Sequence, residues 1–87
     1  MKIYLKRLVS VGFGNKLVTD RILSIMYPNS APIKRMVSDA KELKKLIDAS
    51  CGRKCKSVIV LDTEHVMLSA LSPDTIAARI EKSEDQE

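Results

Sequence analysis

The chain has 87 residues, a formal net charge of +4, 45% hydrophobic residues and 30% charged residues, which is typical of one small globular domain rather than a disordered chain. No apolar run approaches the roughly 20 residues that span a bilayer. Charges interrupt the first apolar residues, unlike in a signal peptide, so we expect a cytoplasmic protein with no membrane partner. A domain of this size is marginally stable alone, and oligomerisation is a common remedy.

Charge is distributed unevenly along the chain. Residues 1–56 hold 13 basic and 4 acidic side chains, a net +9, whereas residues 57–87 hold 2 basic and 7 acidic side chains, a net −5. A basic body with an acidic end favours a polyanionic partner, although a solvated surface fits the same counts. We expect one domain over residues 1–82 and an acidic, disordered tail over residues 83–87.

The first third of the chain predicts two strands joined by a turn. Residues 3–11 alternate loosely and contain β-forming side chains, so they predict a first strand. The Gly-Phe-Gly-Asn sequence of residues 12–15 is a turn signal. Residues 17–18 and then residues 21–27 predict a second strand, which Pro28 ends because proline has no backbone donor.

A helix is predicted to follow Ser30. The Ser30 hydroxyl can cap the free N–H groups, and Pro32 is tolerated in the first turn. The helix is expected to end near Lys44 and Lys45, whose charges suit its negative end. One apolar face is formed by residues at spacings of three and four, namely Ile33, Met36, Val37, Ala40, Leu43 and Ile47.

Residues 46–70 predict successive antiparallel strands around a basic turn. Residues 46–50 form the first arm, residues 51–56 the turn, and residues 58–61 a second strand with no polar gap. That unbroken apolar run predicts a central strand covered on both faces. Residues 66–68 predict a third strand.

A last helix is predicted to start at Ser72-Pro73-Asp74, with Ile76, Ala77 and Ile80 facing inward. The predicted fold class is therefore α+β. We expect a small antiparallel β-sheet or barrel-like domain with one main helix and a short C-terminal helix.

Catalytic and metal-binding patterns are weak in this sequence. The Gly-x-Gly of residues 12–14 lacks the third glycine and the following helix of a nucleotide-binding loop. The single histidine, His65, has no partner constellation. Together with Cys51 and Cys55 it falls short of the four ligands of a structural zinc site. We therefore expect that the protein is not an enzyme and that it binds no cofactor, no metal and no small-molecule substrate.

Basic residues at turns and element ends are the remaining candidates for a binding site. The aromatic residues, one Phe and two Tyr, are too few for a base-stacking platform, so cations are expected to hold phosphates rather than read many bases. The candidates are Arg53, Lys54 and Lys56 on the central turn, Arg21 at a strand end, and Lys34 and Arg35 at the helix start.

Several segments together resemble the family of the extracellular-matrix regulatory protein RemA. The similarity extends over about residues 3–80 and is carried by Val-Gly-Phe-Gly-Asn at residues 11–15, Ser-Ala-Pro-Ile-Lys-Arg-Met at 30–36, Leu-Ile-Asp-Ala at 46–49 and Gly-Arg at 52–53. The resemblance implies a bacterial, DNA-binding transcriptional regulator of biofilm-matrix genes. It also implies a fold related to the LytTR DNA-binding domain and a closed homo-oligomeric ring that wraps duplex DNA around its rim.

The resemblance also implies roles for individual residues. The family's DNA-contacting arginine after the glycine turn falls on Arg53, and its neighbouring arginine falls on Lys54. An arginine that follows the Gly-Phe-Gly-Asn turn falls on Arg21. Lys54 keeps the charge but loses the planar fork that binds two phosphate oxygens at once. Cys51 and Cys55 are outside the family's pattern.

Two other functions remain open on the sequence alone. One is an oligomeric scaffold that binds another protein through its strand edges, and the other is an RNA-binding ring. The salt dependence of DNA binding separates the scaffold from both nucleic-acid functions. Competition between duplex DNA and single-stranded RNA separates the two nucleic-acid functions.

Overall fold

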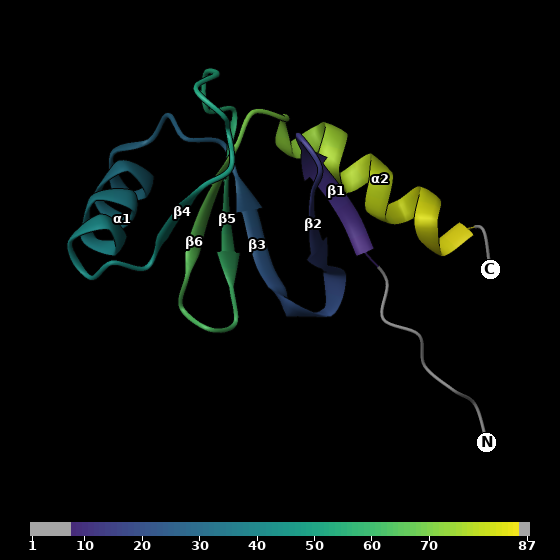
Figure 1. Cartoon of the computed structure of the whole chain (residues 1–87), viewed down its shortest axis with the longest axis horizontal. Coiled ribbons are helices and arrows are strands. Elements are labelled where there is room, and N and C mark those ends of the chain that lie inside the picture. Colours follow the sequence, from purple (N-terminus) through teal and green to yellow (C-terminus); the bar gives the residue numbers. More distant parts are fainter. Residues whose placement is uncertain (1–7, 86–87) are drawn as a thin grey trace.

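A computed structural model describes residues 8–85 of the chain, with the side chains of residues 83–85 left aside. The part of the expected first strand over residues 3–7 lies outside the described residues. The described chain forms six strands, one short 3-10 turn and two helices (Figure 1). In chain order these are β1 (Leu8–Gly12), β2 (Asn15–Val18), η1 (Thr19–Arg21), β3 (Ile22–Met26), α1 (Ala31–Glu42), β4 (Leu46–Asp48), β5 (Ser57–Leu61), β6 (Val66–Ser69) and α2 (Pro73–Asp85).

The strands form two separate sheets rather than a closed barrel. β1 and β2 make an antiparallel pair, and a four-stranded sheet has the order β3-β5-β6-β4. The expected second strand is divided between these sheets by η1, so β2 joins β1 while β3 joins β5. In Figure 1, α1 lies at one end of the molecule, whereas β1, β2 and α2 lie at the other. The α+β class is confirmed.

The central strand β5 separates two hydrophobic clusters. Ile59 packs with Val9, Val11 and Ile76 from the β1 and α2 side, and Val58 packs in a second cluster with residues of α1. Side chains alternate along a strand, so neighbouring residues face opposite layers. Both Val58 and Ile59 are 0% exposed, which confirms that this strand is central and covered on both faces.

The pairing of β4 differs from the sequence prediction. β4 pairs in parallel with β6, with Ile47 opposite Met67, and not with β5. The antiparallel hairpin is β5–β6. Antiparallel neighbours are usually joined by two to five residues, whereas residues 49–56 form a longer connection that lets the chain reach the other side of β6. β4 is consequently an edge strand.

α1 begins as predicted and ends earlier than predicted. The Ser30 hydroxyl accepts a hydrogen bond from the N–H of Ile33 (3.4 Å) and caps the helix. At the other end, Lys44 has a φ of +61°, and Lys45 N–H donates to the carbonyl of Ala40 (2.8 Å). This left-handed cap stops the helix. The prediction that Leu43 and Ile47 continue its apolar face was therefore wrong, since both are exposed.

α2 begins at the predicted signal. The Ser72 hydroxyl accepts from the N–H of Thr75 (3.2 Å), and Pro73 is the first helical residue. Ile76 is fully buried and Ile80 is half-buried, but Ala77 is exposed because it lies about 100° around the helix from Ile76.

The C-terminal helix is also longer than expected. It has 13 residues against 12 in α1, so it is not a short element. It continues to Asp85, and the expected tail over residues 83–87 therefore begins inside the helix, while residues 86–87 lie outside the described residues. Over the described part of the chain, neither helix combines the length and apolarity that crossing a membrane requires.

We predict that Ile76→Ala lowers the free energy of unfolding by about 2–5 kcal/mol, because it leaves a cavity under β1. Ala77→Ser, one position along the same helix, should change that free energy by less than about 0.5 kcal/mol. Chemical denaturation of both variants measures the difference. Equal decreases at the two positions would contradict an α2 that faces the core through Ile76.

Candidate nucleic-acid interface

The connection between β4 and β5 carries the three central cations and is anchored at both ends. We call residues 50–56 the basic loop. At its start, Ser50 donates from its N–H (3.0 Å) and its hydroxyl to the carboxylate of Asp48. At its end, Lys56 N–H donates to the carbonyl of Ser69 (2.8 Å). The backbone therefore holds the loop at two points while Arg53, Lys54 and Lys56 remain exposed.

A tight turn forms the tip of the basic loop. Arg53 N–H donates to the carbonyl of Ser50 (3.0 Å), and the two residues between them, Cys51 and Gly52, have φ of +54° and +79°. Two successive positive φ values define a type I′ turn, for which glycine suits one of the central positions. The turn reverses the chain at the exposed tip of the loop and leaves Arg53 exposed.

A second turn brings Phe13 beside the basic loop. The β1–β2 hairpin closes at Phe13 and Gly14, and the Phe13 ring lies over the guanidinium of Arg53, with the Cζ atom 5.5 Å from the ring centroid. Phe13 and three loop cations line a hollow whose remaining wall is Ala70 and Leu71. The sequence prediction missed Phe13, although a large apolar residue between two glycines in a turn has little chance of reaching the core.

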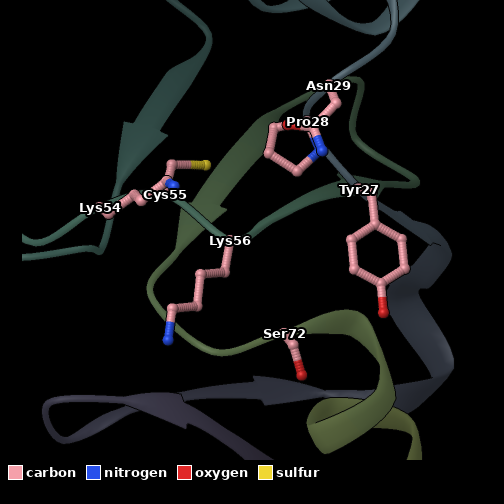
Figure 2. Close-up of a pocket in the computed structure, with 7 residues that line it drawn as sticks. All are labelled: Tyr27, Pro28, Asn29, Lys54, Cys55, Lys56 and Ser72. Atoms are coloured by element: carbon pink, nitrogen blue, oxygen red, sulfur yellow. The ribbon is translucent and has the colours of Figure 1, made fainter.

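The other side of Lys54 and Lys56 borders a second hollow, of about 170 Å³. In the view of Figure 2 the Tyr27 ring points toward the start of α2, where Ser72 lies, and the Lys56 side chain extends on the opposite side of Ser72 from Tyr27. The Tyr27 hydroxyl donates to the carboxylate of Asp74 (2.8 Å), and this hydrogen bond raises the pKa of Tyr27. The two lysines thus stand between two open depressions, each accessible to a partner.

Lys34 and Arg35 lie in the first turns of α1, on exposed positions. Lys34 borders an apolar cleft between α1 and the sheet, which Cys55 of the basic loop also lines. The structure therefore places Lys34 at the same end of the sheet as the basic loop. No described contact ties Arg35 to that loop.

Arg21 is at the opposite end of the sheet. In the β3–β5 ladder Ile22 pairs with Leu61, whereas Met26 pairs with Val58 beside the basic loop. At about 3.3 Å per residue, β3 separates the two ends by about 13 Å. The Arg21 guanidinium also bonds to the Asp62 carboxylate (2.8 Å). One subunit consequently does not combine Arg21 with Arg53 in a single site.

The remaining reactive side chains form no recognisable centre in residues 8–85. No group of three or more His, Cys, Asp or Glu residues in that range could hold a metal ion. Cys51 is exposed, whereas Cys55 is half-buried and donates to the Ser57 carbonyl (3.3 Å). Burial raises the pKa of the Cys55 thiol. The His65 ring contacts the Thr63 hydroxyl (2.8 Å) beside the β5–β6 turn.

Comparisons with known proteins support the resemblance noted in the sequence. Residues 8–80 match the family described as RemA-like, extracellular matrix regulatory protein A-like. A Dictyoglomus thermophilum protein is 57% identical over 81 residues, which cover 93% of this chain and 95% of that protein. A Synechococcus elongatus protein is 52% identical over 73 residues, 84% of each chain. A Bacillus pumilus protein is 46% identical over 79 residues, 91% of this chain and 89% of that protein. The names of all three describe candidate regulatory proteins.

The hydrogen bonds from Ser50 to the Asp48 carboxylate, which anchor the start of the basic loop, should be weakened by acid. The Ser50 hydroxyl and N–H bonds lower the pKa of Asp48. Because this pKa is lowered by folding, the stabilisation is present above the ordinary aspartate pKa of about 3.9 and is lost as the pH falls through the folded-state value. We predict that Ser50→Ala raises the pKa of Asp48 toward the ordinary value, as measured by carboxyl-carbon NMR during a pH titration.

Ser38→Ala is the control for that titration, because Ser38 is exposed on α1. It should leave the pKa of Asp48 where it is in the unmodified protein. An Asp48 titration that is the same in Ser50→Ala and in the unmodified protein would show that the serine does not anchor the loop through this carboxylate.

Proposed function

We propose that this chain, which belongs to the RemA-like family of extracellular matrix regulatory proteins, binds duplex DNA as a transcriptional regulator of the matrix-gene type. The observation that carries the proposal is the basic loop. Arg53, Lys54 and Lys56 project from one short segment whose backbone is fixed at both ends. A rigid scaffold with an exposed, charged loop is a common arrangement for binding.

The cations of the basic loop are free to meet an external anion. Among the described side chains, the ion pairs within 4.0 Å are Arg21–Asp62 and Lys45–Glu64, and neither includes the basic loop. A cation without an internal carboxylate partner keeps its charge available for phosphate. Neutralising phosphates releases condensed counterions, which makes such binding strong at low salt and weak at high salt.

The three cations differ in the contact that they can make. The Arg53 guanidinium can bind two phosphate oxygens in one plane, whereas Lys54 and Lys56 supply point charges. Contacts of this kind fix the position of a duplex without specifying its sequence. Lys34 and Arg35 at the start of α1 are secondary contacts in this proposal. Arg21, at the far end of the sheet, reaches the same duplex only from a different subunit or around a bend.

A homo-oligomeric ring is the second part of the proposal. Both edges of the four-stranded sheet are unpaired within the described chain and carry exposed apolar side chains: Leu23 on β3 is 66% exposed, and Ile47 on β4 is 39% exposed. Contact between unlike edges of neighbouring copies repeats head to tail and closes into a ring when the rotation permits. Each added subunit then contributes another basic loop to one long duplex, which raises avidity without any new type of contact.

We predict that Arg53→Ala weakens binding to all duplexes about equally and lowers the salt slope by roughly one unit for each phosphate that is no longer neutralised. The effect should be larger on long DNA, because it is repeated in every engaged subunit. Lys54→Arg should be neutral or improve affinity, since it restores the planar fork. Gel-shift titrations at several salt concentrations measure both effects.

Lys41→Ala is a charge-matched control for Arg53→Ala, because Lys41 is exposed in the last turn of α1. It should leave affinity and salt slope nearly unchanged. The free energy of unfolding of each variant should stay within about 0.5 kcal/mol of the unmodified protein. Equal affinity and equal salt slope for Arg53→Ala and the unmodified protein would exclude the basic loop as the contact surface. Competition with single-stranded RNA in the same assay distinguishes an RNA-binding ring.

We predict a defined oligomer in light-scattering mass measurements across micromolar concentrations. Leu23→Asp should shift the mass toward the monomer, because it introduces a charge at an apolar sheet edge. Asp20→Asn, next to the same strand on an exposed position, is the control and should leave the mass unchanged. A sharp monomer mass for the unmodified protein would rule out the ring.

A further inference from the structure

Phe13 occupies a backbone position that an aromatic residue rarely takes. Gly12 pairs with Asn15, so Phe13 and Gly14 are the two central residues of the hairpin, with φ of +54° and +79°. Asn, Asp and Gly are the usual residues at the first central position of this turn type. A side chain with a Cβ atom is strained in the left-handed region. The geometry of the turn therefore does not explain why residue 13 is aromatic.

Core packing does not explain the aromatic residue at position 13 either. The Phe13 side chain is 52% exposed and belongs to neither hydrophobic cluster. The partner that the structure gives its ring is the guanidinium of Arg53, 40 positions along the chain. Residues held in strained backbone conformations are concentrated at functional sites.

The hairpin is held firmly enough to position the ring. The Ser69 hydroxyl donates to the carbonyl of Val11 (2.7 Å), in the buried layer directly before the turn. The Asn15 amide donates to the carbonyl of Gly12 (3.1 Å), and the Leu71 side chain lies beside Gly12, within ordinary contact distance (3.6 Å) of where a Cβ at that position would be. The turn thus has a fixed place beside the basic loop.

The contact between Arg53 and Phe13 is a cation–π contact and not a hydrogen bond, so it leaves the guanidinium N–H groups available. The ring attracts the guanidinium through its face. The five N–H groups lie in the plane of the guanidinium, at its edges, where two of them can bind phosphate oxygens together. Phe13 can therefore restrict the flexible arginine side chain without competing with DNA for its donors.

We propose that Phe13 is a positioning residue for DNA binding, whose ring holds the Arg53 guanidinium in the orientation that meets a phosphate. This inference rests on the proposed function, because it assigns Phe13 a role through the same basic loop. Phe13 then acts only through Arg53 and makes no separate contact with DNA.

The test is a double-mutant cycle on the assembled protein with a fluorescent duplex. Phe13→Asn removes the ring and suits the left-handed backbone, so the variant should fold at least as stably as the unmodified protein. Phe13→Leu keeps the size, the apolar character and the strain but removes the aromatic face. Both variants should bind DNA about two- to fivefold more weakly per engaged subunit, the factor that an exposed cation–π contact supplies. Phe13→Tyr keeps the face and should bind like the unmodified protein.

The decisive comparison uses the Arg53→Ala background, in which Phe13→Asn should cause no further decrease in affinity. Unchanged affinity of Phe13→Asn in the unmodified background would overturn the inference. Equal decreases with and without Arg53 would also overturn it, because the ring would then contact DNA by itself. If Arg53→Ala weakens binding while Phe13→Asn does not, only this inference fails. If Arg53→Ala has no effect, the proposed function fails with it.

Discussion

Ser69, at the end of β6, fixes the two turns on which the candidate interface depends. Its hydroxyl donates to the carbonyl of Val11, just before the β1–β2 turn, and its carbonyl accepts from the N–H of Lys56, at the end of the basic loop. Ser69 is 0% exposed, so both hydrogen bonds lie in the interior, where loss of a partner leaves a buried polar group unsatisfied. One buried residue thereby joins the small sheet to the large one and sets Phe13 beside Arg53.

The hydrophobic layers make that junction rigid. β5 and β6 form the middle of the four-stranded sheet, and the clusters on the two faces meet across residues such as Val58 and Ile59. The strands therefore cannot slide without moving a whole row of buried side chains to the wrong face. The turns at the end of such a sheet keep their relative positions, so the arginine–aromatic contact between them (5.5 Å) can persist.

The two ends of the four-stranded sheet differ in how far their positive charge is neutralised by neighbouring carboxylates. At the β5–β6 turn, Asp62 and Glu64 pair with Arg21 and Lys45, so part of the positive charge there is neutralised internally. At the other end the loop cations border two hollows. The summed charge of the chain describes neither end, because neutralisation depends on which turns the strands bring together.

The sequence by itself determined the elements whose causes are local: the capped helix starts at Ser30 and Ser72, the buried run of β5 and the glycine turn that carries Arg53. Caps, positive φ and apolar runs act within a few residues, so they are visible in the chain. The tertiary structure alone decided that β4 pairs with β6, that Arg21 lies far from the basic loop, and that Phe13 meets Arg53. Those relations join residues that are distant in the chain. They depend on which apolar faces are buried together and on the long connection after β4. A local sequence pattern does not show how these two factors bring distant residues together.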